Sequence, residues 1–283
     1  MRTISHLPRV AIALAISLGL AQAASVASAA QLTLVSAGNP VDVISATGTV
    51  DGDTLTHEFI DGLSNDSGPD TALFTDFQTG TPEPLSGTMV EAGHNQLLSL
   101  DTSGPEASLT LDMGHLWAIS GNGTLANYSL VQSLSVDNLS LRVHGNAGEA
   151  LGQQVKVHFS GWASVLTIGD TGSGASTHDF AITLDVLNGL NPVASYQGLW
   201  GQSADDLIDF SFDAAVGDEL TLVLSAYQGI NTAPDLALAG LTELGGQVSL
   251  NGSFSVSPVP EPMSLALAIA GMAALWMMGQ RRL

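Results

Sequence analysis

The stretch FSFDAAVGDELTLVL, residues 210–224, decides the fold class. Apolar and polar residues alternate on both sides of Gly217-Asp218. A period of two is typical of β-strands that bury one face and expose the other. Glycine tolerates the positive φ that tight hairpin turns need, so Gly217-Asp218 predicts a two-residue turn. We therefore expect a β-hairpin in this stretch.

The same alternation recurs along the chain, in segments 139–144, 155–160 and 248–256. Asp51-Gly52 and Asp137-Asn138 predict further turns. Helical signals at 203–208 and 234–240 are weak, and each predicts at most one turn that needs tertiary support. We find no repeat of about 20 to 50 residues. The chain is therefore predicted to be all-β, a single antiparallel β-sandwich, jelly-roll-like, with about ten to twelve strands.

The C-terminus has three parts in a fixed order. Val259-Pro260-Glu261-Pro262 comes first, residues 263–279 carry no charge, and Arg281-Arg282 follow. As a helix, residues 263–279 would reach roughly 26 Å, slightly less than the hydrocarbon core of a bilayer. The two arginines would resist translocation. The prolines cannot continue a helix, so they predict an extended, accessible segment before the span.

This ending resembles the PEP-CTERM sorting signal of exported Gram-negative proteins. The resemblance covers residues 258–283, with Val259, Pro260, Glu261 and Pro262 as the motif and Arg281 and Arg282 as the basic stop. It implies transient membrane insertion through residues 263–279 and removal of the tail by exosortase, a membrane-embedded cysteine protease or transpeptidase. It also implies a final location at the cell surface or in the extracellular matrix. A C-terminal anchor that is never cleaved is the alternative.

The N-terminus predicts export as well. Arg2 and Arg9 precede the apolar residues 10–20, and small-residue cleavage sites for signal peptidase end at Ala23 and Ala29. Eleven mostly apolar residues are too few for a stable transmembrane helix, so this pattern is typical of a signal peptide. We expect three parts: a signal peptide at 1–29, an exported acidic domain at 30–257, and the sorting signal at 258–283.

The exported domain is strongly acidic. It carries 26 acidic side chains and two basic ones, Arg142 and Lys156, for a net charge of about −24. Such a charge repels nucleic acid and attracts divalent cations. The chain has no cysteine, which excludes disulfides, thiolate metal sites and thiol nucleophiles. At about 228 residues the domain is large enough to bury a core without covalent cross-links.

Two acidic loops are candidate calcium sites. Asp51 and Asp53 flank Gly52, and Asp170 lies between Gly169 and Thr171. Ca²⁺ binds about six to eight carboxylate and carbonyl oxygens, which such loops can supply. Neither loop has the EF-hand pattern. The alternative is that each aspartate only stabilises its own turn through its side chain.

The sequence gives no pattern for catalysis. The histidines of the exported domain are scattered, and none pairs with another at a ligand spacing such as i and i+2 or i and i+4, which argues against a zinc site. His144 and His158 lie at the polar positions of alternating segments, so we expect them to face solvent. G-x-S-x-G and phosphate-loop motifs are absent. Carboxylates are too numerous for any pair to be singled out, and we expect no enzyme.

We therefore expect a non-enzymatic protein of the cell surface or of an exopolysaccharide biofilm matrix, with a structural or adhesive role. Exosortase and signal peptidase are the expected processing partners, and the matrix polysaccharide is the expected neighbour. No cofactor other than Ca²⁺ is expected. The alternative is a carbohydrate-binding module of the β-sandwich type, with or without a requirement for calcium, in which Trp117, Trp162, Trp200 or Tyr196 stack on sugar rings. A polysaccharide hydrolase would need two isolated carboxylates in a cleft.

Overall fold

A computed structural model describes most of the exported domain. The described residues are 30–60, 62–79, 83–85, 88–146, 149–169, 176–232, 235–238 and 240–259. The predicted signal peptide and all of the predicted sorting signal beyond Val259 lie outside them. All regular secondary structure in the described ranges is β-strand. No helix in these ranges has the length and hydrophobicity needed to cross a bilayer.

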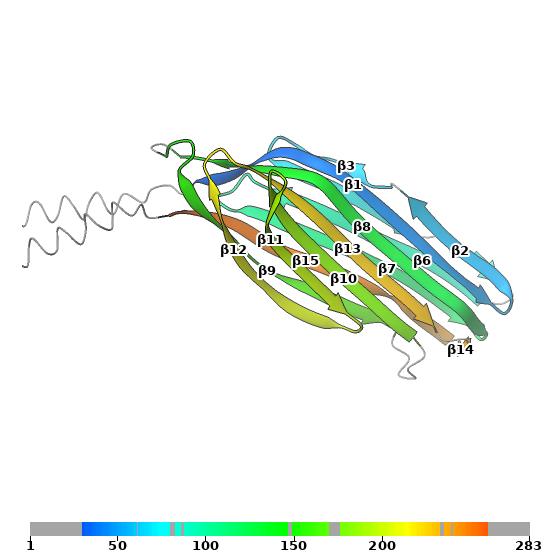
Figure 1. The fold of residues 1–283 in the computed structure, drawn as a ribbon. Helices are drawn as coiled ribbons and strands as arrows, with labels where there is room; N and C mark the ends of the chain where they lie inside the picture. The colour runs from blue at the N-terminus through cyan, green and yellow to red at the C-terminus, as the bar shows by residue number, and fades with distance from the viewer. Residues whose placement is uncertain are drawn as a thin grey trace, which may run out of the picture.

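The strands form two antiparallel sheets (Figure 1). Sheet A has the order β11-β10-β13-β8-β1-β2, with β14 beside β8, and sheet B has the order β12-β9-β15-β7-β6-β4-β3, with β5 beside β6. The bounds are β1 Gln31–Val50, β2 Asp53–Ile60, β3 Ser64–Asn65, β4 Thr71–Thr79, β5 Glu83–Leu85, β6 Thr88–Asp101, β7 Ala107–Gly121, β8 Thr124–His144, β9 Gln154–Ile168, β10 Ser176–Asn188, β11 Asn191–Trp200, β12 Ala204–Ala215, β13 Glu219–Thr232, β14 Asp235–Ala237 and β15 Gly240–Pro258. The predicted all-β class is confirmed, and the two sheets are consistent with a β-sandwich.

The predicted hairpin at residues 210–224 is wrong. Its two strands exist, but β12 pairs with β9 in sheet B while β13 pairs with β10 and β8 in sheet A. Residues 216–218 therefore cross between the sheets. The Gly217 N–H, at a φ of +98°, donates to the carbonyl of Val143. A crossover and a hairpin both bury alternate residues, so the alternation alone does not identify the partner strand.

Two other local predictions are also corrected. Residues 204–208 belong to β12 and residues 235–237 to β14, so neither weak helical signal forms a helix. Asn138 has a φ of +61° as predicted for a turn residue, but it lies within the long strand β8. The pairing of β8 with β13 shifts register there, which makes the feature a β-bulge. Strand pairing on both sides of β8 overrides the local turn preference.

The predicted turn at Asp51-Gly52 is confirmed. It joins β1 to β2 in a two-residue hairpin loop, with Val50 paired to Asp53. Asp51 has a φ of +49° and Gly52 a φ of +95°. Positive φ at both central positions is typical of the tight turns that match the twist of a hairpin.

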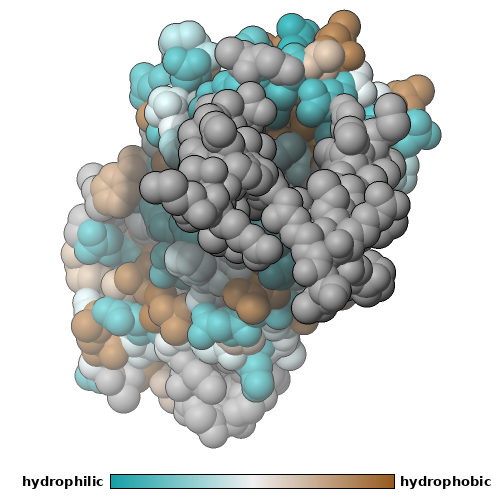
Figure 2. Space-filling view, turned by 90° about the vertical axis from the view of Figure 1, so that its left-hand side faces the viewer, coloured by the Kyte–Doolittle hydropathy of each residue, from teal (hydrophilic) through white to brown (hydrophobic). Residues whose placement is uncertain are grey.

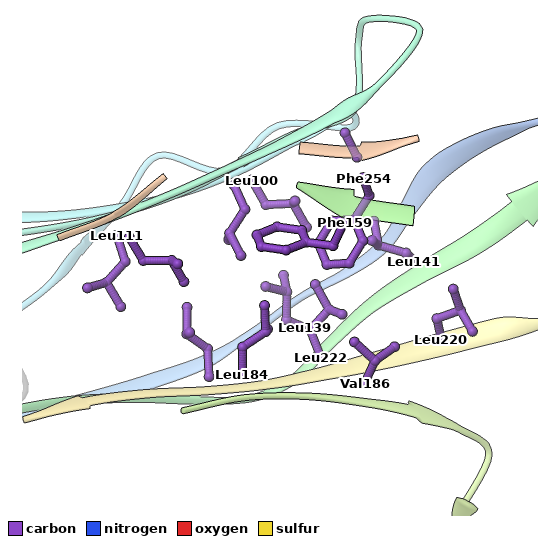
Figure 3. Packing of buried hydrophobic residues seen from close by; sticks show 14 of the residues in the cluster. Leu100, Leu111, Leu139, Leu141, Phe159, Leu184, Val186, Leu220, Leu222 and Phe254 are labelled. Carbon is purple, nitrogen blue, oxygen red and sulfur yellow. The ribbon is translucent and has the colours of Figure 1, made fainter. Parts of the chain in front are cut away.

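Two hydrophobic clusters fill the space between the sheets. The larger contains most of the leucines and phenylalanines of the core, and the smaller surrounds Trp117 and Tyr128. In Figure 3, Leu100 and Leu111 from sheet B point toward Leu139, Leu184 and Leu222 from sheet A. Each fully buried leucine contributes about 1.5 to 3 kcal/mol to folding relative to an exposed one. Packing between the sheets is therefore the main stabilising contribution.

The described chain begins and ends at one end of the sandwich (Figure 1). At the start of β1, Gln31 pairs with His144, the last residue of β8, and the last residue of β15, Pro258, pairs with Val155 near the start of β9. We call this the terminal end, and the end with the β1–β2 turn the distal end. Looking onto the terminal end, Figure 2 shows hydrophobic residues separated by hydrophilic ones.

Candidate functional site

A layer of polar side chains crosses the interior of the sandwich. Along each of β6, β7, β8 and β13, the buried apolar residues belong to the larger hydrophobic cluster at one end of the strand and to the smaller cluster at the other. A buried polar residue lies between these two parts of the strand. We call these residues and their contacts the polar layer: His57, Asp76, His94, Gln96, His115, Gln132 and Gln228. All except His57, which is half-buried, are at least 90% buried. Buried polar side chains reduce stability unless they are hydrogen-bonded, so this layer is a candidate functional site.

Three side chains of the layer form a chain of contacts. His94 Nε2 lies 2.8 Å from Asp76 Oδ2, and His94 Nδ1 lies 3.4 Å from His57 Nε2. The carboxylate can only accept, so it keeps the proton of neutral His94 on Nε2. His94 Nδ1 then presents a lone pair toward His57. The chain joins the sheets, because His57 lies on β2 of sheet A and the other two on β4 and β6 of sheet B.

His115 completes a cluster of three imidazoles. It pairs directly with His94 across β6 and β7, and its ring centroid lies 5.7 Å from that of His57. Among the described residues, neither of its two buried ring nitrogens has a hydrogen-bond partner. Burial, together with the smaller effects of the nearby His57 and His94, lowers the pKa of His115 to about 3. His115 is therefore neutral at ordinary pH.

Glutamines extend the layer across the interior. Gln228 Nε2 donates to Gln132 Oε1, and Gln132 Nε2 donates to the carbonyl of Asn95 over 3.4 Å. Neither side-chain polar atom of Gln96 has a hydrogen-bond partner, although both are buried. Gly246 lies beside this group, and a Cβ there would come within 2.7 Å of Gln228 Oε1. The absent side chain at Gly246 leaves room for the Gln228 amide.

A cavity of about 270 Å³ on sheet B borders the histidines. Its lining residues are Phe77, Gln78, Gly93, His94, Asn95, Gly114, His115, Leu116, Ile168, Gly246 and Gln247. Gly93 and Gly114 lie at outward-facing positions of β6 and β7, but Gly114 is buried, because a Cβ there would come within 2.5 Å of Asn95 Oδ1. The Asn95 amide therefore covers the sheet at Gly114.

The structure describes two of the three predicted calcium residues, Asp51 and Asp53. Asp51 is exposed, and its carboxylate accepts a hydrogen bond of 2.9 Å from the backbone N–H of Thr124, which fastens the β1–β2 turn to the start of β8. Asp53 is also exposed, and Asp170 lies outside the described residues. In the described ranges, no three His, Asp or Glu side chains converge closely enough to hold a metal ion as they stand. Asp51 therefore has the turn-stabilising contact that was the alternative to calcium binding.

Of the sorting motif, the structure describes Val259. It is 36% exposed, directly follows β15, and its N–H donates to the carbonyl of Gln154 at 3.4 Å. Pro260, Glu261, Pro262, Arg281 and Arg282 lie outside the described residues. The motif therefore begins where the last strand ends.

The four candidate sugar-stacking aromatics do not share a surface. Trp117 is buried in the smaller hydrophobic cluster, and Trp162 is 55% exposed on β9. Trp200 and Tyr196 lie on β11, at the edge of the other sheet, and pack partly against the larger cluster. Of the four, Trp162 alone presents most of its surface to solvent.

Sequence reasoning missed the histidine cluster. Its prediction of scattered histidines holds for His144, which is exposed at the end of β8, and for the half-buried His158. It fails for His57, His94 and His115, because strand pairing and the packing of the two sheets bring them together. One signal was present: His94 and His115 occupy inward-facing positions in their strands, which are otherwise apolar on β7 and apolar except for Gln96 on β6.

Comparisons with known proteins identify no family. No family model matches the chain, and no curated protein matches it. Among solved structures, infectious bursal disease virus of the Gt strain aligns over 82% of this chain and 79% of that chain, at 10% identity and a TM-score of 0.18. The VP2 subviral particle of the same virus aligns over 90% and 88%, at 8% identity and a TM-score of 0.17. Likenesses at these TM-scores carry no argument about function.

Proposed function

We propose that this chain is an exported, non-enzymatic protein of the cell surface or of an exopolysaccharide biofilm matrix. Signal peptidase removes the N-terminal segment, and exosortase removes the C-terminal tail after transient membrane insertion. The mature acidic domain then has a structural or adhesive role beside matrix polysaccharide. We base this proposal on the sequences of the N-terminal and C-terminal segments.

One structural observation carries it: the position of Val259. The sorting motif starts one residue after the last strand, at a partly exposed residue. A protease acting on an extended segment needs accessible backbone. Cleavage at or beyond the motif would leave all of β15 in place, so the folded domain would survive removal of its tail.

The order of the strands supports the jelly-roll arrangement within this proposal. Four strands of sheet B, β12-β9-β15-β7, face four of sheet A, β11-β10-β13-β8. Along the chain these eight strands alternate between the sheets except at β10 and β11, which follow each other in sheet A. Eight strands wound as two Greek keys form a jelly roll. The remaining strands extend its two sheets at one side.

The distribution of charge supports a role for divalent cations. Arg142 lies two residues before the end of β8 and Lys156 two residues after the start of β9, so both basic residues of the domain lie at the terminal end. The terminal end is also where the tail leaves. The distal end has acidic residues without a cationic residue near them in the strands. We propose that Ca²⁺ or Mg²⁺ links this acidic surface to anionic polysaccharide.

Carbohydrate binding is the second candidate, and Trp162 favours it. In the register of sheet B, Trp162 lies beside Leu207 on β12 and Asn251 on β15. An exposed ring between an apolar side chain and an amide is a suitable surface for one sugar ring. In this alternative, Trp162→Ala abolishes retention on polysaccharide, whereas the cation-bridged role predicts that the variant is retained.

Release from the matrix tests the proposed role. Cells that produce the protein are washed with buffer containing a chelator or the same chelator saturated with Ca²⁺, and the released protein is quantified. The proposal predicts release by the free chelator and retention with the saturated one. Equal retention in both washes would contradict a cation-bridged role.

A further inference from the structure

We propose that His57, His94 and His115 bind one late first-row transition-metal ion, of which Zn²⁺ is the representative. Asp76 would accept a hydrogen bond from His94 Nε2, the ring nitrogen that does not bind the ion. The ion would join sheet A to sheet B through the interior of the sandwich. This inference is independent of the proposed function.

The distance between two ring nitrogens carries the inference. His57 Nε2 and His94 Nδ1 are 3.4 Å apart. Zinc lies about 2.0 to 2.1 Å from a histidine nitrogen, so two nitrogens on one tetrahedral zinc ion are about 3.3 to 3.4 Å apart. N–H···O hydrogen bonds usually measure about 2.7 to 3.2 Å, and the contact between the two ring nitrogens is longer, at the outer limit of a hydrogen bond. The pair is therefore spaced as two ligands of one ion.

Asp76 gives this pair the outer contact that metal-bound histidines have. Its carboxylate lies 2.8 Å from His94 Nε2, the nitrogen remote from His57. A ligating histidine usually donates its second N–H to a carboxylate or carbonyl, which fixes the tautomer and the ring orientation. Asp76 thereby directs the His94 Nδ1 lone pair toward the position between the two histidines.

His115 is the third ligand. Both of its ring nitrogens are buried and have no partner. Its ring centroid is 5.7 Å from that of His57, and the centroids of His57 and His94 are 5.6 Å apart. Imidazoles around one tetrahedral ion have centroids about 5 Å apart, given zinc–nitrogen distances near 2 Å. The three rings do not yet converge at ligand distances, so binding requires His115 to rotate and the rings to close by roughly half an ångström.

The chemistry of the ligands selects the class of ion. Three imidazoles suit zinc, copper, nickel or cobalt, whereas Ca²⁺ and Mg²⁺ prefer oxygen. The cavity that borders His94 and His115 shortens the path for an ion from solvent. The acidic surface would raise the local cation concentration.

Metal titration of the full-length chain in detergent tests the site. After chelator treatment, Zn²⁺ is titrated against a chromophoric competitor in the presence of excess Mg²⁺, and Co²⁺ is titrated separately. We expect one Zn²⁺ per chain that Mg²⁺ does not displace, and the intense visible absorption of tetrahedral Co²⁺. Displacement by Mg²⁺, or an octahedral Co²⁺ spectrum, would place the ion on surface carboxylates and overturn the proposal.

Matched variants assign the ligands. Asp76→Asn should weaken Zn²⁺ binding about 10- to 100-fold, and His57→Ala, His94→Ala or His115→Ala should weaken it more. His158→Ala is the control, because His158 also lies near a carboxylate, that of Asp209 at 3.8 Å. Unchanged binding in the three histidine variants, or loss of binding in the control, would overturn the assignment. If a histidine variant does not fold, the Co²⁺ spectrum of the unmodified chain decides.

Discussion

His57 Nε2 and His94 Nδ1 lie 3.4 Å apart, although the two histidines belong to different sheets. This contact connects sheet A to sheet B within the polar layer. The polar layer separates the two hydrophobic clusters of the interior. In this part of the sandwich, buried imidazoles and amides lie where the rest of the interior has apolar side chains. The interior should therefore respond to pH and to metal ions.

Stability should fall as the pH is lowered. The pKa of His115 is about 3 in the folded chain, against about 6.5 in an unfolded chain. Below pH 6.5 the unfolded chain binds a proton at this residue and the folded chain does not. The free energy of unfolding should therefore decrease by roughly 1.4 kcal/mol per pH unit between pH 6.5 and pH 3, with no contribution from His115 above pH 6.5.

Urea unfolding at pH 6.5 and pH 5, in the presence of a chelator, measures this effect. His115 should account for roughly 2 kcal/mol of the difference between the two pH values. The variant His115→Met should lose that part of the pH dependence, since methionine does not titrate and suits an apolar site. Equal pH dependence in the two proteins would show that His115 does not contribute.

The leucines of the two faces should respond differently to the same substitution. Leu111 is fully buried between the sheets, whereas Leu207 is 76% exposed on β12. Leu111→Ala should reduce the free energy of unfolding by about 2 to 5 kcal/mol, because it removes buried contacts and leaves a cavity. Leu207→Ala should change it by less than about 0.5 kcal/mol. Equal effects in urea unfolding would contradict the assignment of inner and outer faces.

Alternation in the sequence predicted the buried apolar residues of segment 139–144, but not that Ser140, at a polar position of the same segment, is buried as well. Leu139, Leu141 and Val143 are buried in β8 as expected, and Arg142 and His144 are exposed. The alternation did not predict strand partners. Two consecutive strands bury alternate residues whether they form a hairpin within one sheet or cross from one sheet to the other. The stretch 210–224 is the clearest case, since both of its strands were predicted and their pairing was wrong.

The candidate site was harder to predict, because it depends on those partners. Residues 94 and 115 become neighbours through the register of β6 and β7, and residue 57 joins them when the two sheets pack. A rule based on the spacing of histidines in the sequence detects neither the strand register nor the packing of the two sheets. The turn at Asp51-Gly52 was predictable because a hairpin turn depends on only two adjacent residues.

A substitution of Asp51 can distinguish calcium binding by its carboxylate from the hydrogen bond that the same side chain accepts in the turn. Asparagine keeps a side-chain oxygen for the Thr124 N–H and tolerates positive φ, but it removes the charge. Asp51→Asn should therefore preserve the Tm without Ca²⁺. If Asp51 is a ligand, Ca²⁺ raises the Tm of the unmodified protein and not that of Asp51→Asn. A similar Ca²⁺ response of both proteins would contradict a role of Asp51 in calcium binding.

Intact-mass spectrometry of the protein released by the cells that produce it tests the central claim most directly, since one spectrum reports both terminal cuts. We predict a chain that begins after Ala23 or Ala29 and lacks residues 263–279 together with Arg281 and Arg282. A released chain that retains these C-terminal residues, or a protein that never leaves the cytosol, would contradict export with removal of the tail.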